Sequence, residues 1–238
     1  MRSFIAAQRS MRLIPTARGR IFAAASMSRR RAAVILAGGD SNRMGQPKAW
    51  LSHGGETLLH RVVRIAMQAC PLAVVVGAPG QSLPPLPDGA LRIDDDASLG
   101  AAGPLLGACS GLRTCAELGS EVAYVGACDA AWLSAVHVES MLQRLERDST
   151  ALAVVPESGP FEDGTRIVHA TSGVVRVPVA RDTAAALLRA GQGALRRLYE
   201  GLGARRVAVA SLPDPEAISA CNTPEQWAAA QRRWAAPQ

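Results

Sequence analysis

The feature that most constrains the fold is a run of apolar residues, AAVILA at 32–37, that ends at Gly38-Gly39. A short apolar run without polar alternation is typical of a strand that is buried on both faces. Similar runs at 72–76 and 122–127 indicate two more strands of this kind. Several strands buried on both faces require helices on each side of a largely parallel sheet.

The segments between these runs alternate between helical and strand patterns. Helices are predicted at 57–69, 105–118, 134–147, 183–190, 194–202 and 224–234. Further strands are predicted at 90–93, 151–156, 168–177 and 206–210, and the proline-rich segment 79–88 is predicted to be a loop. This order predicts an α/β protein with a three-layer Rossmann-like fold and a mostly parallel, partly mixed central sheet. Ligands of such sheets bind beyond the carboxyl ends of the strands.

The positive charge of the chain is concentrated at one end. The net charge is +6, but residues 1–31 contain eight arginines and no acidic residue, which leaves 18 basic and 20 acidic residues in the rest. We therefore expect a basic N-terminal extension at 1–31, disordered or preceding the true start, and one domain at 32–235. A targeting peptide and an arm for an anionic partner are the other interpretations of the extension. Because the basic residues belong to this segment, the composition argues against a nucleic-acid-binding domain.

Composition also limits the cellular setting. No run of about 18 apolar residues occurs, so no membrane span is expected. The five cysteines are odd in number and form no Cys-x-x-Cys pair, which argues against a disulfide framework or a zinc knuckle. These features predict a protein of the reducing cytoplasm.

The loop after the first strand is suited to phosphate. Glycines such as Gly38 and Gly39 let backbone N–H groups approach a polyphosphate, and Arg43 and Lys48 supply positive charge. Lys48 is the only lysine, so a compact ammonium is used where the chain otherwise uses arginine. The loop matches neither G-x-x-x-x-G-K-[ST] nor G-x-G-x-x-G, so neither a P-loop ATPase nor a dinucleotide-binding fold is supported.

Two acidic positions follow predicted strands. Asp129 comes just after the strand at 122–127, where a carboxylate is well placed to bind Mg²⁺ together with phosphate oxygens. Its alternative role is to cap the helix that follows. Asp94, Asp95 and Asp96 are consecutive and point in different directions, so the run contains either one functional carboxylate or only a solvated turn.

The ordered motifs resemble those of the nucleotide-diphospho-sugar transferase-like nucleotidyltransferases, and within them the molybdenum cofactor guanylyltransferases. The resemblance covers about residues 32–235. It rests on the L-A-G-G-x-S-x-R-M-G-x-x-K pattern at 36–48, Asp96 seven residues before G-P-L-L-G at 103–107, Ala127-Cys128-Asp129, His169 before a strand, and N-T-P-E at 222–225.

The resemblance implies a function and a set of roles. It implies Mg²⁺-dependent transfer of GMP from GTP to a molybdopterin-type acceptor, with release of pyrophosphate. The implied nucleotide-binding residues are Leu36, Ala37, Gly38, Gly39, Lys48, Asp96 and Asp129. Asp129 is the implied magnesium ligand, Arg43, Lys48 and Asp129 are the implied catalytic residues, and His169 and Asn222 are the implied acceptor-binding residues.

Departures from the family pattern keep alternatives open. The family commonly has asparagine where this chain has Gly77 and Ala220, and Thr-Pro where it has Ala130-Ala131. The losses of asparagine remove donor–acceptor side chains that could read a base edge or contact the acceptor. The alternatives are a molybdopterin cytidylyltransferase, a sugar-phosphate nucleotidyltransferase, and a degenerate nucleotide-binding accessory protein. Molybdoenzyme-maturation proteins are further candidate partners.

Overall fold

The computed structural model describes residues 30–38, 46–100 and 102–235. Gly39 and Arg43, two of the expected site residues, lie outside this part of the chain, as do residues 1–29 of the expected extension. Arg31 is the first residue of a strand, and its guanidinium donates to the carboxylates of Glu139 and Glu146 at 2.6–2.7 Å.

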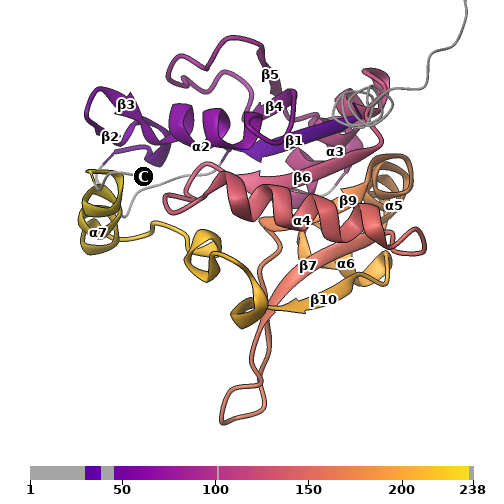
Figure 1. Cartoon of the computed structure of the whole chain (residues 1–238). Helices are drawn as coiled ribbons and strands as arrows, with labels where there is room; N and C mark the ends of the chain where they lie inside the picture. The colour runs from indigo at the N-terminus through magenta and orange to yellow at the C-terminus, as the bar shows by residue number, and fades with distance from the viewer. Residues whose placement is uncertain (1–29, 39–45, 101, 236–238) are drawn as a thin grey trace, which may run out of the picture.

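One eight-stranded sheet forms the centre of the molecule (Figure 1). Its order is β10-β7-β9-β6-β1-β4-β5, with β8 paired to β7. Strand β9 is antiparallel to β6 and to β7, β8 is antiparallel to β7, and the other pairs are parallel, so the predicted mostly parallel, partly mixed sheet is confirmed. The strands are β1 (Arg31–Leu36), β4 (Leu72–Gly77), β5 (Ala90–Asp94), β6 (Val122–Ala127), β7 (Ala153–Ser158), β8 (Ile167–Val168), β9 (Ser172–Arg176) and β10 (Arg205–Ala208).

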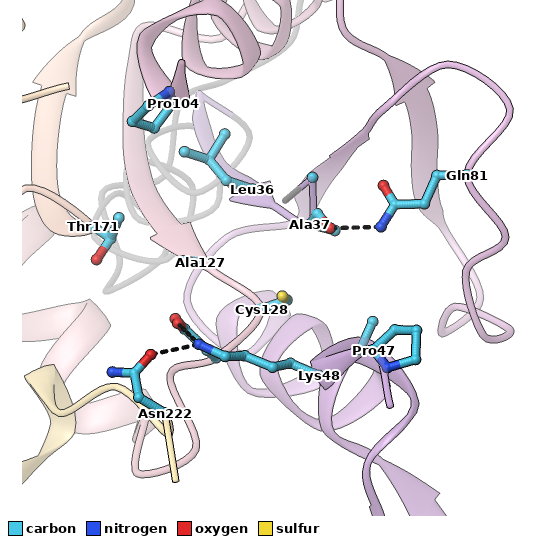
Figure 2. A pocket seen from close by; sticks show the side chains of 13 residues that line it. Leu36, Ala37, Pro47, Lys48, Gln81, Pro104, Ala127, Cys128, Thr171 and Asn222 are labelled. Atoms are coloured by element: carbon cyan, nitrogen blue, oxygen red, sulfur yellow. Dashed lines mark hydrogen bonds and ion pairs between the residues drawn. The ribbon is translucent and has the colours of Figure 1, made fainter. Parts of the chain in front are cut away.

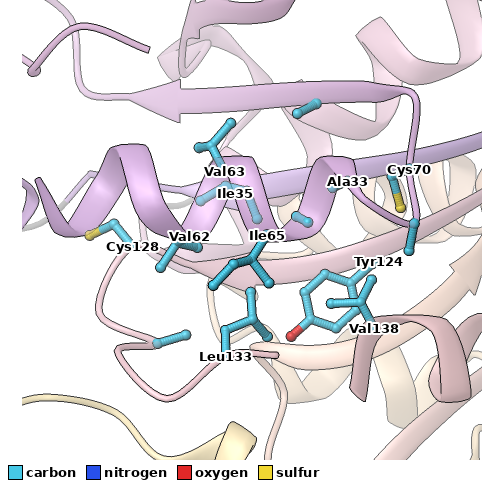
Figure 3. Close-up of a cluster of buried hydrophobic side chains, with 14 of the residues drawn as sticks. Ala33, Ile35, Val62, Val63, Ile65, Cys70, Tyr124, Cys128, Leu133 and Val138 are labelled. Atoms are coloured by element: carbon cyan, nitrogen blue, oxygen red, sulfur yellow. The ribbon is translucent and has the colours of Figure 1, made fainter. Parts of the chain in front are cut away.

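Helices cover both faces because alternate residues of each central strand point to opposite sides. In β1, Ala33 and Ile35 join one buried cluster, whereas Val34 and Leu36 join the other. Figure 3 shows part of the first cluster, to which Val62 and Val63 of one helix and Tyr124 of the sheet belong, with Tyr124 beside Val138. Helices α2 (Leu58–Met67), α4 (Ala135–Arg147) and α7 (Pro224–Ala235) contribute to the first cluster, and α3 (Pro104–Glu117), α5 (Val177–Arg189) and α6 (Arg196–Gly201) to the second.

Two predicted elements differ from the structure. The single strand expected at 168–177 is interrupted, because His169 accepts a backbone hydrogen bond from Ser172 in a tight turn between β8 and β9. Helix α5 begins at Val177 rather than at 183, since Pro178 fits its first turn and a buried face starts with Val177 and Ala180. The short hairpin of β2 (Ser52–His53) and β3 (Glu56–Thr57) was not predicted.

A buried polar cluster joins strands β6 and β9 to helix α4. The Nε2 atom of His137 is 2.8 Å from the Ser172 hydroxyl, which is also 3.3 Å from the hydroxyl of Tyr124. All three side chains are excluded from solvent. Burial lowers the pKa of His137 to about 4, so the histidine is neutral at pH 7 and acts as a structural group.

Candidate active site

A cavity of about 320 Å³ opens beyond the carboxyl ends of β1 and β6 (Figure 2). This is the edge where ligands of α/β sheets bind. Its walls come from the end of β1, the segment after β6, the loop after β4, and the segment before α7. They are formed by Leu36, Ala37, Gly38, Pro47, Lys48, Ala49, Gln81, Pro104, Ala127, Cys128, Asp129, Thr171 and Asn222.

Three polar side chains from distant parts of the sequence meet in this cavity. The ammonium group of Lys48 lies 2.9 Å from the Asp129 carboxylate and 2.5 Å from the Asn222 side-chain oxygen (Figure 2). The Lys48 and Asp129 side chains keep 15% and 22% of their surface exposed, so both remain accessible from the cavity. An ammonium has three N–H donors. Two are used here, which leaves one for an incoming oxyanion.

Local backbone contacts hold these groups together. Lys48 begins a short 3₁₀ helix, η2 (Lys48–Trp50), directly after Pro47. The backbone oxygen of Asp129 accepts hydrogen bonds from the N–H groups of Ala131 and Cys221, at 2.8 Å each. The second bond joins the end of β6 to the residue next to Asn222. The main chain therefore fixes the Asp129 carboxylate and the Asn222 amide relative to each other.

Helix α7 is anchored by its aromatic side chains. The Trp234 indole N–H donates to the Ala131 carbonyl at 2.9 Å, and the Arg61 guanidinium lies 4.4 Å from the centre of the Trp234 ring. At its other end, the Gln226 side chain accepts from the backbone N–H of Asn222 at 2.7 Å. The helix thus holds Asn222 against the Lys48 ammonium.

The end of β1 lines the cavity, but most of its backbone groups already have partners. The Ala37 N–H donates to Val76, and the Ala37 carbonyl accepts from the Gln81 side chain. The Leu36 carbonyl accepts from the Cys128 N–H. Within the described residues, Gly38 is the member of the expected Leu36–Gly38 contact set whose N–H has no protein acceptor. Among the described contacts, its N–H is therefore the one of the three that is left for a ligand.

Asp96 does not line this cavity, whereas its neighbour Asp95 lines an adjoining one. The Asp96 carboxylate accepts from the Ser98 N–H and hydroxyl and from Arg113 at 3.0 Å. These hydrogen bonds from Ser98, followed by that from Arg113, lower the pKa of Asp96. Asp95 instead lines an adjoining cavity of about 300 Å³, together with Gly38 and Pro104. The Asp96 carboxylate is thus engaged by Ser98 and Arg113, and its expected contact with the nucleotide stays a prediction.

A larger hollow of about 710 Å³ adjoins the other side of the first cavity and shares Pro104, Thr171 and Asn222 with it. His169 lies in its wall, half buried, with Nε2 2.8 Å from the Ser158 hydroxyl, and burial lowers its pKa. The exposed Arg196 also lines it, and no carboxylate does so among the described residues. An anion would meet a favourable surface in this hollow.

A close backbone contact shapes the boundary between these cavities. A Cβ atom added at Gly193 would lie 1.9 Å from the carbonyl oxygen of Ala102, and the Gly193 carbonyl accepts from the Leu105 N–H at 3.0 Å. Only a residue without a side chain allows this approach. The contact fixes the start of α3, including Pro104, which lines all three hollows.

Several wall residues were not predicted from the sequence. Gln81 and Thr171 line the main cavity, and Arg196 lines the larger hollow that contains His169. Arg196 is one of 25 arginines, and no motif distinguishes it from the others. The Ala130 and Ala131 side chains, which replace Thr-Pro, are buried in the core instead of facing the cavity.

The side chains of the cavity match the chemistry of one group of metals. Within the described residues, no three His, Cys, Asp or Glu side chains converge on a point, so no metal cage is built from protein alone. Mg²⁺ commonly binds through one or two carboxylates, substrate phosphates and water. The partly exposed Asp129 carboxylate meets that requirement. The thiol of Cys128 does not compete as a ligand or nucleophile, because burial raises its pKa to about 12.

Comparisons with known proteins agree with this geometry. Residues 33–212 match the model of the MobA-like NTP transferase domain. A Mycobacterium tuberculosis protein named probable molybdenum cofactor guanylyltransferase is 35% identical over 181 residues, which are 75% of this chain and 84% of that protein. A protein of the same name from Mycolicibacterium paratuberculosis is 33% identical over 194 residues, which are 81% of this chain and 90% of that protein.

Solved structures show the same fold at lower identity. Molybdopterin-guanine dinucleotide biosynthesis protein A from Archaeoglobus fulgidus has a TM-score of 0.64 and 17% identity, and the match covers 86% of this chain and 98% of that chain. A 2-C-methyl-D-erythritol 4-phosphate cytidylyltransferase from Thermus thermophilus has a TM-score of 0.62 and 20% identity, with 84% and 97% covered. None of the helices in the described ranges has the length and hydrophobicity needed to span a bilayer. The match over most of the folded chain and the curated relatives above 30% identity show that this protein belongs to the MobA-like NTP transferases, a family of nucleotidyltransferases.

Proposed function

We propose that this protein transfers GMP from GTP to a molybdopterin-type acceptor in a magnesium-dependent reaction, with release of pyrophosphate. The observation that carries the proposal is the meeting of Lys48, Asp129 and Asn222 in one cavity beyond the strand ends. The names of the curated relatives, which match along most of their length, supply the guanylyl group and the molybdenum cofactor.

The chemistry of the transfer requires positioning and charge neutralisation. A phosphate oxygen of the acceptor forms a bond to the α-phosphorus of GTP, and the bond from that phosphorus to the bridging oxygen of pyrophosphate breaks. Lys48 uses its remaining N–H to bind a phosphate oxygen, and the Gly38 N–H provides a second donor. A magnesium ion held by Asp129 would neutralise phosphate charge. Arg43 remains a proposed phosphate ligand on the basis of the loop motif.

The acceptor is assigned to the hollow that contains His169 and Arg196. This hollow adjoins the main cavity and shares Thr171 and Asn222 with it, so a molecule bound there would lie next to the nucleotide. Arg196 supplies positive charge for an anionic acceptor, and the neutral His169 supplies a hydrogen bond. Asn222 lies in both walls and is the proposed contact between nucleotide and acceptor.

Asp95 replaces Asp96 as the proposed acidic contact of the nucleotide. Asp95 lines the hollow beside Gly38, whereas the Asp96 carboxylate is occupied by Ser98 and Arg113. A carboxylate accepts two hydrogen bonds side by side, and the guanine edge offers two adjacent donors. This pairing favours guanine over cytosine.

The test combines binding and turnover with one protein preparation. Isothermal titration with GTP, CTP and ATP in the presence of Mg²⁺ is followed by an assay of pyrophosphate release with molybdopterin-type acceptor. We expect GTP to bind most tightly and pyrophosphate to appear only with acceptor. Tighter binding of CTP would assign the cytidylyl branch. GTP binding without pyrophosphate above the Lys48→Ala background would instead identify a nucleotide-binding accessory protein.

A further inference from the structure

Gln81 is held in an unusual position at the wall of the main cavity. It ends a turn in which the Gln81 N–H donates to the Ala78 carbonyl at 3.0 Å. Gly80, at the third position of this turn, has φ of +71°, which suits a glycine that follows proline in a type II turn. The turn folds the chain back toward the strand ends and places the Gln81 side chain beside Ala37, just after β1 (Figure 2).

The side-chain amide of Gln81 joins the two strands. Its nitrogen donates to the Ala37 carbonyl at 3.0 Å, and its oxygen accepts from the Ala78 N–H at 2.8 Å. One partner is an obligatory acceptor and the other an obligatory donor, so the amide has one orientation. The Arg92 guanidinium also donates to the Gln81 backbone carbonyl. The amide is therefore preorganised before any ligand arrives.

Two hydrogen-bonding positions of this amide are still available. An amide has two N–H donors and two acceptor lone pairs. The two backbone bonds together use one donor and one acceptor. One donor and one acceptor therefore remain on a side chain that lines the cavity and is only partly exposed. A free donor and a free acceptor allow the amide to bind polar groups on the edge of a nucleic acid base.

The same volume is closed to the residue at the end of β4. A Cβ atom added at Gly77 would lie 3.3 Å from the Gln81 side-chain oxygen and 3.2 Å from Leu83. Both distances are tighter than ordinary contacts, and a longer side chain would displace the Gln81 amide. Gly77 and Gln81 therefore form a matched pair, in which the absence of one side chain makes room for the other.

Charge divides the cavity into two ends. Among its described lining residues, the charged side chains are Lys48 and Asp129, and Figure 2 shows Lys48 beside Asn222 and apart from Gln81. A triphosphate is attracted to the charged end. The uncharged part of the nucleotide is left to the walls formed by Gln81 and its apolar neighbours.

We propose that Gln81 is a specificity-determining residue, whose fixed side-chain amide forms hydrogen bonds with the base of the bound nucleotide. The proposal rests on the proposed function in one respect, since it requires a nucleoside triphosphate in this cavity. It does not depend on the identity of the acceptor or on turnover. Nucleotide binding is therefore the appropriate readout.

The experiment compares nucleotide selectivity in the full-length protein. Dissociation constants for GTP, CTP and ATP with Mg²⁺ are measured for the natural protein and for Gln81→Leu, which keeps the approximate size but removes both polar atoms. Gln81→Glu keeps an acceptor for the Ala78 N–H but cannot donate to the Ala37 carbonyl. Gln143→Leu, on the surface of α4 and outside the main cavity, is the matched control.

The expected result is a loss of discrimination. Gln81→Leu should weaken binding of the preferred nucleotide by about tenfold, the value of one or two hydrogen bonds, and reduce its advantage over the other two. Gln143→Leu should retain the natural ratio. An equal weakening for all three nucleotides, with a parallel fall in the melting temperature, would show a structural role and overturn the proposal. If the unsubstituted protein binds no nucleotide, the proposed function itself is overturned. If it binds nucleotides and Gln81→Leu keeps the same ratio of dissociation constants, only this inference is overturned.

Discussion

The Lys48 ammonium lies 2.9 Å from the Asp129 carboxylate, although 81 residues separate them in the sequence. Each side chain offsets the charge of the other in a partly buried cavity, where an unpaired charge would be costly. The ion pair therefore keeps one positive and one negative group in the cavity where a triphosphate and its metal would bind. An incoming magnesium nucleotide supplies new partners for both.

Removing the charge of Asp129 should abolish transfer with little effect on folding. Asp129→Asn keeps the size of the side chain and an acceptor for Lys48, but it loses the charge that a magnesium site requires. We expect pyrophosphate release to fall by about 100-fold or more. Titration of GTP with and without Mg²⁺ should show that the metal no longer improves binding. Asp182→Asn, at an exposed position of α5, is the control and should behave as the natural protein.

The choice of lysine at position 48 should matter as much as its charge. Lys48→Arg keeps the positive charge, but a planar guanidinium is larger and cannot place one compact charge between Asp129 and Asn222. We expect a loss of turnover of about 100-fold, measured by pyrophosphate release at saturating GTP. Arg197→Lys on the surface of α6 tests the general cost of exchanging these cations. Full activity in Lys48→Arg would contradict the requirement for a compact charge.

Much of the fold could be predicted because its strands are apolar runs with few alternatives. The alternation of β1, β4 and β6 with helices is visible in the sequence, and the position of Asp129 at a strand end follows from it. The meeting of Lys48 with Asn222 could only be expected from the family resemblance. They lie 174 residues apart, and their contact depends on how α7 docks.

Some details of the cavity walls depend on local geometry that the sequence does not reveal. Asp95 and Asp96 differ by one position, but Asp96 caps the 3₁₀ helix η3 (Ala97–Leu99), whereas Asp95 lines the adjoining cavity. Gln81 was not predicted because its place in the cavity wall depends on a turn that folds the loop back over the strands. In both cases tertiary geometry, rather than residue type, selects the residue that lines a cavity.

Replacing Arg196 should weaken binding of the acceptor and leave binding of the nucleotide unchanged. Arg196→Gln removes the cation from a hollow that has no described carboxylate in its wall. We expect the KM for the acceptor to rise by about tenfold, the value of one charge-assisted hydrogen bond, with an unchanged dissociation constant for GTP. Arg197→Gln is the matched control, because the adjacent guanidinium is paired with Glu200 on the surface at 2.7 Å. A similar rise in both variants would indicate general attraction by positive charge instead of a specific contact.

His137 should make the folded state sensitive to mild acid. Burial lowers its pKa from 6.5 to about 4, so below pH 6.5 the unfolded chain takes up a proton that the folded chain excludes. The free energy of unfolding should therefore fall as the pH decreases from about 6.5 to about 4, by up to about 3 kcal/mol. His137→Gln retains a polar partner for Ser172 and cannot be protonated. Its melting temperature should decline less over this range than that of the natural protein.

The contact between the residues preceding α3 and α6 should be sensitive to a single methyl group. In Gly193→Ala the new Cβ would lie 1.9 Å from the Ala102 carbonyl oxygen, so the backbone must move. We expect a destabilisation of about 2 kcal/mol, seen as a melting temperature roughly 4–8 °C lower. Gln192→Ala, at the exposed neighbouring position, should change the melting temperature by much less. Because Pro104 lines the three hollows and lies beside this contact, Gly193→Ala should also raise the KM for GTP and for the acceptor. A variant with lower stability but natural KM values would show that the contact supports the fold without shaping the site.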